Sequence, residues 1–177
     1  MNAATATARW RLPLNFVVFQ AAWLICVMAV ARGQQAAGVG VIVAAVTLHL
    51  VLSPHWLRES GLIALVTLIG LVWDSLVMDA GWLRYPATGV LPWLAPLWIV
   101  AMWTLFATLL NVSLRWLRNR RSLAAVFGCI GGPLAYYGGA RLGAVTLARP
   151  AAALATEAVG WAILTPLLVW LAETLDE

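Results

Sequence analysis

Long apolar runs, separated by short polar connections, make up almost the whole chain. Six of these runs are close to the roughly 20 residues that an α-helix needs to cross the hydrocarbon core of a membrane. The runs are residues 14–31, 36–53, 61–78, 90–114, 122–140 and 151–172. We therefore predict an all-α fold, in which six transmembrane helices form one domain over residues 1–177. The second and third runs are among the shortest, so five spans are the alternative.

Composition excludes a water-soluble domain. Of the 177 residues, 63% are hydrophobic and 10% are charged, whereas soluble domains are about half apolar and about a quarter charged. A soluble protein of this size cannot hide so much apolar surface, because small domains leave much of their surface exposed. Eleven Trp residues agree with a membrane location, since Trp favours the interface between lipid headgroups and acyl chains.

The basic residues predict the orientation. All eleven are Arg, and they are scattered between apolar runs rather than gathered into a nucleic-acid surface. The one cluster is Arg115, Arg118, Arg120 and Arg121. Since basic residues favour the cytoplasmic side, this connection and both termini are predicted to be cytoplasmic. Membrane lipids are the expected partners, and nucleic acid is not.

Three charged side chains lie at membrane depth, where such residues are rare and often mark sites. Asp74 is in the third run, Glu157 in the sixth, and Arg141 at the end of the fifth. The predicted topology places all three in the outer half of the bilayer, with Tyr136 and Tyr137 slightly deeper. We predict a polar pocket there that binds a small solute or a lipid. A structural ion pair of Arg141 with either carboxylate is the first alternative, and unrelated interface residues are the second.

Weaker candidates surround this pocket. Trp98 of the fourth run could stack on a flat ligand or on Arg141. A second polar layer, nearer the cytoplasm, consists of Asn15, Gln20, His49 and Asn111. We interpret this layer as hydrogen bonds between helices. The nearby His55, Arg58 and Glu59 are expected to form a solvated turn.

Metal and cofactor chemistry has no signal in the sequence. The two His and two Cys residues lack the spacing of metal ligands. Motifs for phosphate-binding loops, zinc proteases and serine hydrolases are missing from the sequence. We therefore predict no metal and no cofactor.

Small residues single out the fifth run for close helix packing. Gly128 and Gly132 are four residues apart, as are Gly139 and Gly143, and such pairs let helix backbones approach closely in lipid. We expect this helix to be central in the bundle, with Pro133 able to kink it. It could also pack on a second copy of the chain or on a partner subunit.

Local signals predict several helix ends. Pro54 closes the second run, and Ser60 and Ser122 are expected to cap the third and fifth. Pro96 is expected to bend the fourth helix or to mark its start. The turn-rich, aromatic connection 79–89 is expected to lie along the outer interface.

Spaced motifs along the chain resemble a family of small bacterial inner-membrane proteins known only as a domain of unknown function. The residues that carry the resemblance are Asn15, Phe16, Phe19, Gln20 and Trp23, then Gly70 and Asp74, then Pro96, Leu97, Trp98, Trp103 and Phe106, then Gly128, Gly132, Pro133, Tyr136 and Gly139. The resemblance covers about residues 14–170. It implies a six-helix protein of a bacterial inner membrane and assigns no catalytic residue.

Three functions therefore remain open. The first is a binding or transport component with an outer pocket formed by Asp74, Arg141 and Glu157. The second is a membrane-embedded enzyme that modifies a lipid with Asp74 and Glu157, one as acid and the other as base. The third is an accessory subunit without catalytic activity that packs on a partner through its Gly-rich fifth helix.

Overall fold

The computed structural model describes the backbone of residues 3–86 and 91–176, and side chains from residue 10 onward within those ranges. Val90 and residues 87–89 of the predicted aromatic connection lie outside the described residues, as does the side chain of Arg9. The described helices are α1 (Ala3–Ala31), α2 (Gln35–Leu52), α3 (Trp56–Asp79), α4 (Leu97–Leu110), α5 (Arg121–Arg141) and α6 (Pro150–Asp176). A 3-10 turn, η1 (Arg115–Leu117), and two short strands, β1 (Leu83–Arg84) and β2 (Thr146–Leu147), complete the elements. The prediction of an all-α protein is confirmed.

Five of the described helices are long and apolar enough to cross a membrane: α1, α2, α3, α5 and α6. The exception is α4, whose 14 residues extend about 21 Å at 1.5 Å per residue. This is less than the hydrocarbon core of about 30 Å. The predicted fourth span was therefore too long, and the shortest described helix is α4, not α2 or α3 as the apolar runs indicated.

Pro96 explains where α4 begins. Its backbone is extended, with φ −65° and ψ 154°, and the helix starts at the next residue. The Pro96 carbonyl accepts hydrogen bonds from the backbone N–H groups of Ile99 and Val100. Proline is suited to this place, because it lacks the N–H that a residue inside a helix must donate. Of the two expectations for Pro96, the start of the helix is confirmed.

Two predicted helix caps were wrong. α3 begins four residues before Ser60, and the Ser60 hydroxyl donates to the Trp56 carbonyl at 2.8 Å. α5 begins at Arg121, so Ser122 lies inside the helix. In both cases the helix continues past the apolar run into charged residues, because only the middle of a membrane helix must be apolar.

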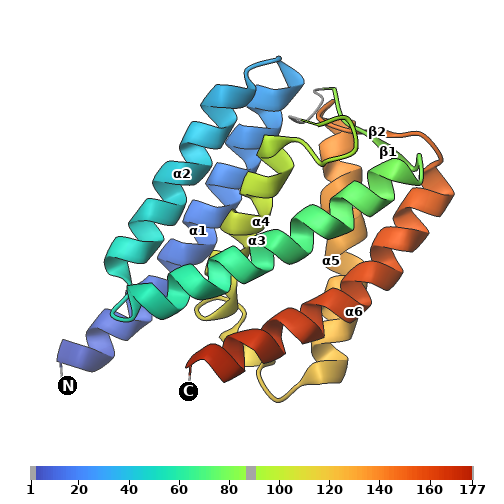
Figure 1. Cartoon of the computed structure of the whole chain (residues 1–177). Helices are drawn as coiled ribbons and strands as arrows, with labels where there is room; N and C mark the ends of the chain where they lie inside the picture. Colours follow the sequence, from blue (N-terminus) through green and yellow to red (C-terminus); the bar gives the residue numbers. More distant parts are fainter. Residues whose placement is uncertain (1–2, 87–90, 177) are drawn as a thin grey trace.

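The short helix α4 is the centre of the bundle. α1 and α2 lie side by side, α3 crosses in front of α4, and α5 and α6 form a pair on the other side (Figure 1). Nine of the 14 residues of α4 are buried. α5 packs mainly on α6, so the expectation of a central α5 was wrong. Gly128 and Gly132 serve that interface, because a Cβ atom at either position would collide with Trp161 of α6.

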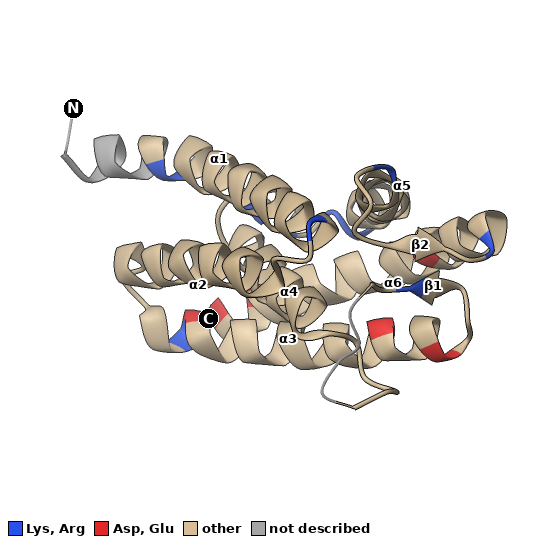
Figure 2. Cartoon of the chain, turned by 90° about the horizontal axis from the view of Figure 1, so that it is seen from above, with Lys and Arg blue, Asp and Glu red and all other residues tan. Residues whose placement is uncertain are grey.

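The two ends of the bundle differ in what holds them. At one end, which we call the termini end, the start of α1 and the end of α6 lie on the same side (Figure 1). At the other, the strand end, β1 and β2 pair antiparallel with Leu83 opposite Leu147. This pair joins the connection after α3 to the connection after α5. Most of the helical ribbon between the two ends carries no charged residue (Figure 2).

Candidate functional site

Asp74 of α3 is fully buried at the strand end and is surrounded by hydrogen-bond donors. The hydroxyls of Tyr85 and Tyr136 donate to its Oδ1 at 2.6 and 2.7 Å. The indole Nε1 of Trp103 donates to its Oδ2 at 2.6 Å. Burial raises the pKa of Tyr85 well above its ordinary value, so this hydroxyl keeps its proton and remains a donor. Three elements besides α3 thus converge on one carboxylate.

Glu157 of α6 is a second fully buried carboxylate. Its Oε2 accepts from the indoles of Trp73, at 3.2 Å, and Trp161, at 3.1 Å. Its Oε1 has no hydrogen-bond partner among the described residues. The rings of Trp103 and Trp161 stack with centroids 4.8 Å apart and planes 8° apart. The two carboxylates are therefore linked through a pair of stacked indoles.

Glycines on neighbouring helices make the space for these indoles. A Cβ atom at Gly70 of α3 would overlap the ring of Trp103, and one at Gly160 of α6 would overlap Trp73. Gly132 of α5 gives the same room to Trp161. Glycine inside a helix costs up to about 1 kcal/mol relative to alanine. Glycine at these positions therefore lowers the stability of the helix, but it leaves the space in which the indoles lie beside the carboxylates.

Neither carboxylate has a cationic partner in the described part of the chain. The ion pairs of the described residues join His49 to Glu59, and Arg115 and Arg118 to Asp176. Arg141 is exposed at the end of α5, so the ion pair with Asp74 or Glu157 that the sequence left open is not formed there. Buried charge without an opposite charge is costly, even where neutral donors solvate it. A proton or an external cation must balance these carboxylates.

A cavity of about 110 Å³ lies against Asp74. Half of the residues that line it are aromatic, namely Trp23, Tyr85, Trp98, Trp103, Phe106, Tyr136 and Trp161. Trp98 packs edge-on against Tyr85, with centroids 5.6 Å apart, and its Nε1 has no partner among the described residues. Glu157 does not line this cavity. The lining of the cavity thus combines one buried carboxylate with aromatic faces.

The structure brings together only part of the predicted pocket. Asp74, Tyr136 and Trp98 line one cavity, and Glu157 is attached to it through Trp161. Tyr137, at 47% exposure, and Arg141 are on the surface.

Sequence reasoning missed Tyr85, Trp73, Trp103 and Trp161 as members of this site. One signal was present, because Glu157 and Trp161 are four residues apart and therefore share a helix face.

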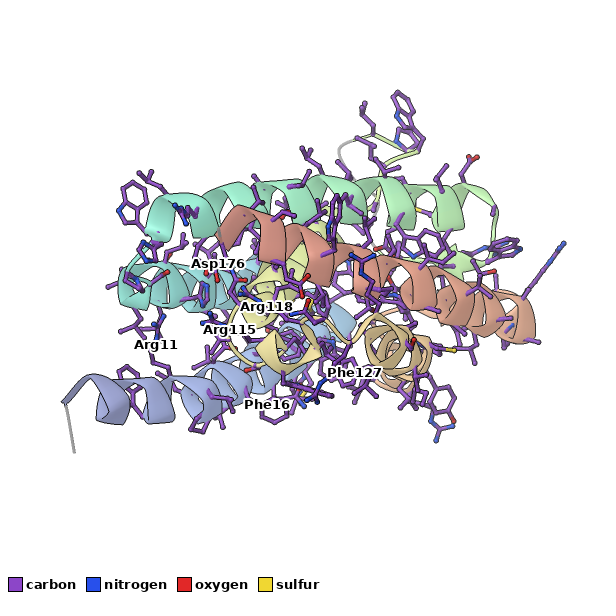
Figure 3. All side chains as sticks on the ribbon, turned by 90° about the horizontal axis from the view of Figure 1, so that it is seen from below. Arg11, Phe16, Arg115, Arg118, Phe127 and Asp176 are labelled. Carbon is purple, nitrogen blue, oxygen red and sulfur yellow. The ribbon has the colours of Figure 1, made fainter. Side chains whose placement is uncertain are left out.

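The second predicted polar layer forms a network at the termini end. His49 Nε2 lies 3.1 Å from Glu59 Oε2, and Asn111 donates to Glu59 Oε1 at 2.9 Å. Arg118 then bonds both Asn111, at 2.6 Å, and Asp176, at 2.8 Å. Arg115, Arg118 and Asp176 gather at this end (Figure 3). The expectation that Glu59 is solvated was wrong, because α3 begins before it and points it at His49 of α2.

The other two members of that layer lie beside the network. Asn15 donates to the Thr108 carbonyl at 3.1 Å and accepts from the Ser113 hydroxyl at 2.6 Å, which joins α1 to the end of α4. Gln20 is exposed on α1. No group of three or more His, Cys, Asp or Glu residues suited to a metal occurs among the described residues.

Comparison with known proteins identifies the family. A family model described as "Protein of unknown function (DUF2878)" matches residues 12–167, which is most of the chain. No curated protein and no solved structure matches the chain. The match confirms the resemblance to a family of unknown function that the spaced motifs indicated. The chain therefore belongs to the DUF2878 family.

Proposed function

We propose that the protein is a membrane-embedded binding component, which holds the ammonium group of a small organic molecule in the cavity beside Asp74. One observation carries this proposal: a fully buried carboxylate lines an aromatic cavity, and all of its described hydrogen bonds come from neutral donors. An ammonium ion supplies the missing positive charge. Aromatic faces add to its binding, because their negative quadrupoles attract cations.

Binding is favoured over catalysis by the position of the second carboxylate. An acid–base mechanism needs both groups within reach of the substrate. Asp74 lines the cavity, whereas Glu157 lies behind the stacked indoles and does not. We assign Glu157 the role of holding Trp73 and Trp161, and with them the wall of the cavity.

The proposal includes a topology. The whole chain is one membrane domain in the inner membrane of a bacterium, with both termini cytoplasmic and the cavity in the outer half of the bilayer. The exposed Arg115, Arg120 and Arg121 at the termini end support this orientation, because arginine in short connections favours the cytoplasmic side. A ligand would then reach Asp74 from the outer side or from the lipid.

Hexylammonium tests the proposal, with hexanol as its neutral counterpart. Binding to the protein in lipid nanodiscs is measured by equilibrium dialysis, relative to the amount of each compound in the bilayer. We expect the protein to bind hexylammonium and not hexanol. Asp74→Asn keeps the shape of the side chain and removes its charge, so it should weaken ammonium binding at least about tenfold, the usual effect of losing a charged hydrogen bond.

The matched control is Asp79→Asn, in the same helix. Asp79 is exposed and lies outside the cavity, so this variant should bind like the unmodified protein. Equal binding by the Asp74→Asn and Asp79→Asn proteins would refute the proposal. Chemical conversion of the bound amine would instead favour the enzyme.

A further inference from the structure

A second and larger hollow lies between α1 and α5, where the bundle is open on its side. Its volume is about 590 Å³, and we call it the lateral groove. Phe16 of α1 and Phe127 of α5 flank it (Figure 3). Both rings are about half exposed, at 51% and 42%, and their helices are apolar enough to cross a membrane. The surroundings of this groove in a bilayer are therefore lipid.

The packing of the helices explains why the groove exists. α5 is held mainly by α6, and it approaches α1 near the strand end, where a Cβ at Gly138 would touch the Trp23 ring. Toward the termini end the two helices leave a gap. No atom would lie within 4 Å of a Cβ placed at Gly131, which lines this gap. The groove is thus closed at one end and open along its side.

The lateral groove adjoins the cavity beside Asp74. Four residues line both hollows: Trp23, Phe106, Ala135 and Trp161. From Phe127 to Ala135 the wall formed by α5 extends eight residues, or about 12 Å at 1.5 Å per residue. A molecule whose head lies at Asp74 would reach the part of the groove along α5 if its chain passed between these shared side chains.

We propose that the lateral groove holds the hydrocarbon chain of the bound ligand, which makes that ligand a long-chain ammonium amphiphile that enters from the lipid between α1 and α5. This inference rests on the ammonium site proposed above. The groove offers an apolar surface with a polar, negatively charged cavity at its closed end, which matches an amphiphile with a positive head. In lipid the chain gains little from leaving the bilayer, so its contribution comes from close packing in the groove.

Photolabelling locates the chain. Dodecylammonium with a diazirine at the end of its chain is added to the protein in nanodiscs, irradiated, and the labelled peptides are identified by mass spectrometry. We expect label on the segments 16–20 and 127–135, which form the two walls. Label spread evenly over the lipid-facing helices would overturn the groove as the binding place of the chain.

Filling the groove tests the same point by affinity. Gly131→Phe places a ring in the open space of the groove, and it should weaken dodecylammonium binding about tenfold without changing hexylammonium binding. Gly40→Phe is the matched control, since Gly40 is also a helical glycine with open space around it and lies on α2 outside both hollows. If the phenylalanine variant does not accumulate, Gly131→Leu serves as the smaller substitution.

The outcomes separate this inference from the proposed function. If hexylammonium binding depends on Asp74 while dodecylammonium binding ignores Gly131→Phe, the groove inference is wrong and the ammonium site stands. If dodecylammonium labels the groove and depends on Gly131 but ignores Asp74→Asn, the groove holds a chain and the ammonium site is wrong. If neither substitution changes the binding of either amine, both proposals fail.

Discussion

The acidic residues at the two ends of the bundle have different hydrogen-bond partners. At the termini end, Glu59 is bonded to His49 and Asn111, and Asp176 is bonded to arginine. At the strand end, Asp74 and Glu157 are bonded only to tyrosine hydroxyls and indole N–H groups among the described residues. The first arrangement can balance its charge within the chain, and the second cannot. We infer that the termini end holds the helices together, and the function proposed above assigns the strand end to a ligand.

The largest expected effect on stability is at the termini end. Glu59→Leu leaves His49 and Asn111 buried without their shared acceptor, and breaking a buried pair in this way costs about 3 kcal/mol of unfolding free energy. Unfolding in mixed detergent micelles measures the loss. The folded protein should still bind hexylammonium with unchanged affinity. If the Glu59→Leu protein were as stable as the unmodified protein, the termini end would not have the stabilising role that distinguishes it from the strand end.

A smaller effect is expected where glycine makes room for an indole at the strand end. Gly70→Leu pushes Trp103 away from Asp74, and overpacking of this kind costs about 2 kcal/mol. Hexylammonium binding should fall as well, because Trp103 both bonds Asp74 and lines the cavity. The same unfolding and dialysis measurements report both changes.

Gly61→Leu is the matched control for that substitution. Gly61 lies in the same helix, and no atom would contact a Cβ placed there. Its stability should therefore not fall, and should rise by up to about 1 kcal/mol, because leucine favours a helix more than glycine does. If Gly70→Leu and Gly61→Leu proved equally mild, the glycine would not be what positions Trp103.

Much of the fold could be predicted because the length of an apolar run is enough to recognise a membrane helix in the sequence. The bounds of α2 and α5 lie within one residue of the predicted runs, whereas α1 ends where predicted but begins earlier, at Ala3. The prediction of a fourth span over residues 90–114 was wrong because apolar content does not distinguish a spanning helix from a short helix enclosed by the others. Pro96 was the available sign, and it was noted as a helix start. The exchange of roles between α4 and α5 could not be predicted, since glycine spacing shows that helices approach closely but does not show which helix is the neighbour.

The candidate site was predicted in part for a related reason. Asp74 and Glu157 stood out because charge at membrane depth is rare. Arg141 was included in the predicted pocket because it lies at the same depth in the membrane. In the structure, however, its side chain is exposed at the end of α5. The place of a residue in an apolar run predicts its depth in the bilayer but not the direction in which its side chain points. The donors Tyr85 and Trp103 come from a connection and from the central helix, so only the packed structure brings them to Asp74.

The charge of Asp74 in the bound complex is the most direct measurement of the central claim, that the ligand's cation balances this carboxylate. Infrared difference spectra recorded on addition of hexylammonium distinguish an ionised carboxylate from a protonated carboxyl group. We expect an ionised carboxylate signal in the amine-bound protein that is absent from the Asp74→Asn protein and retained in the Asp79→Asn protein. An amine-bound protein in which Asp74 absorbs as a protonated carboxyl group would contradict this claim.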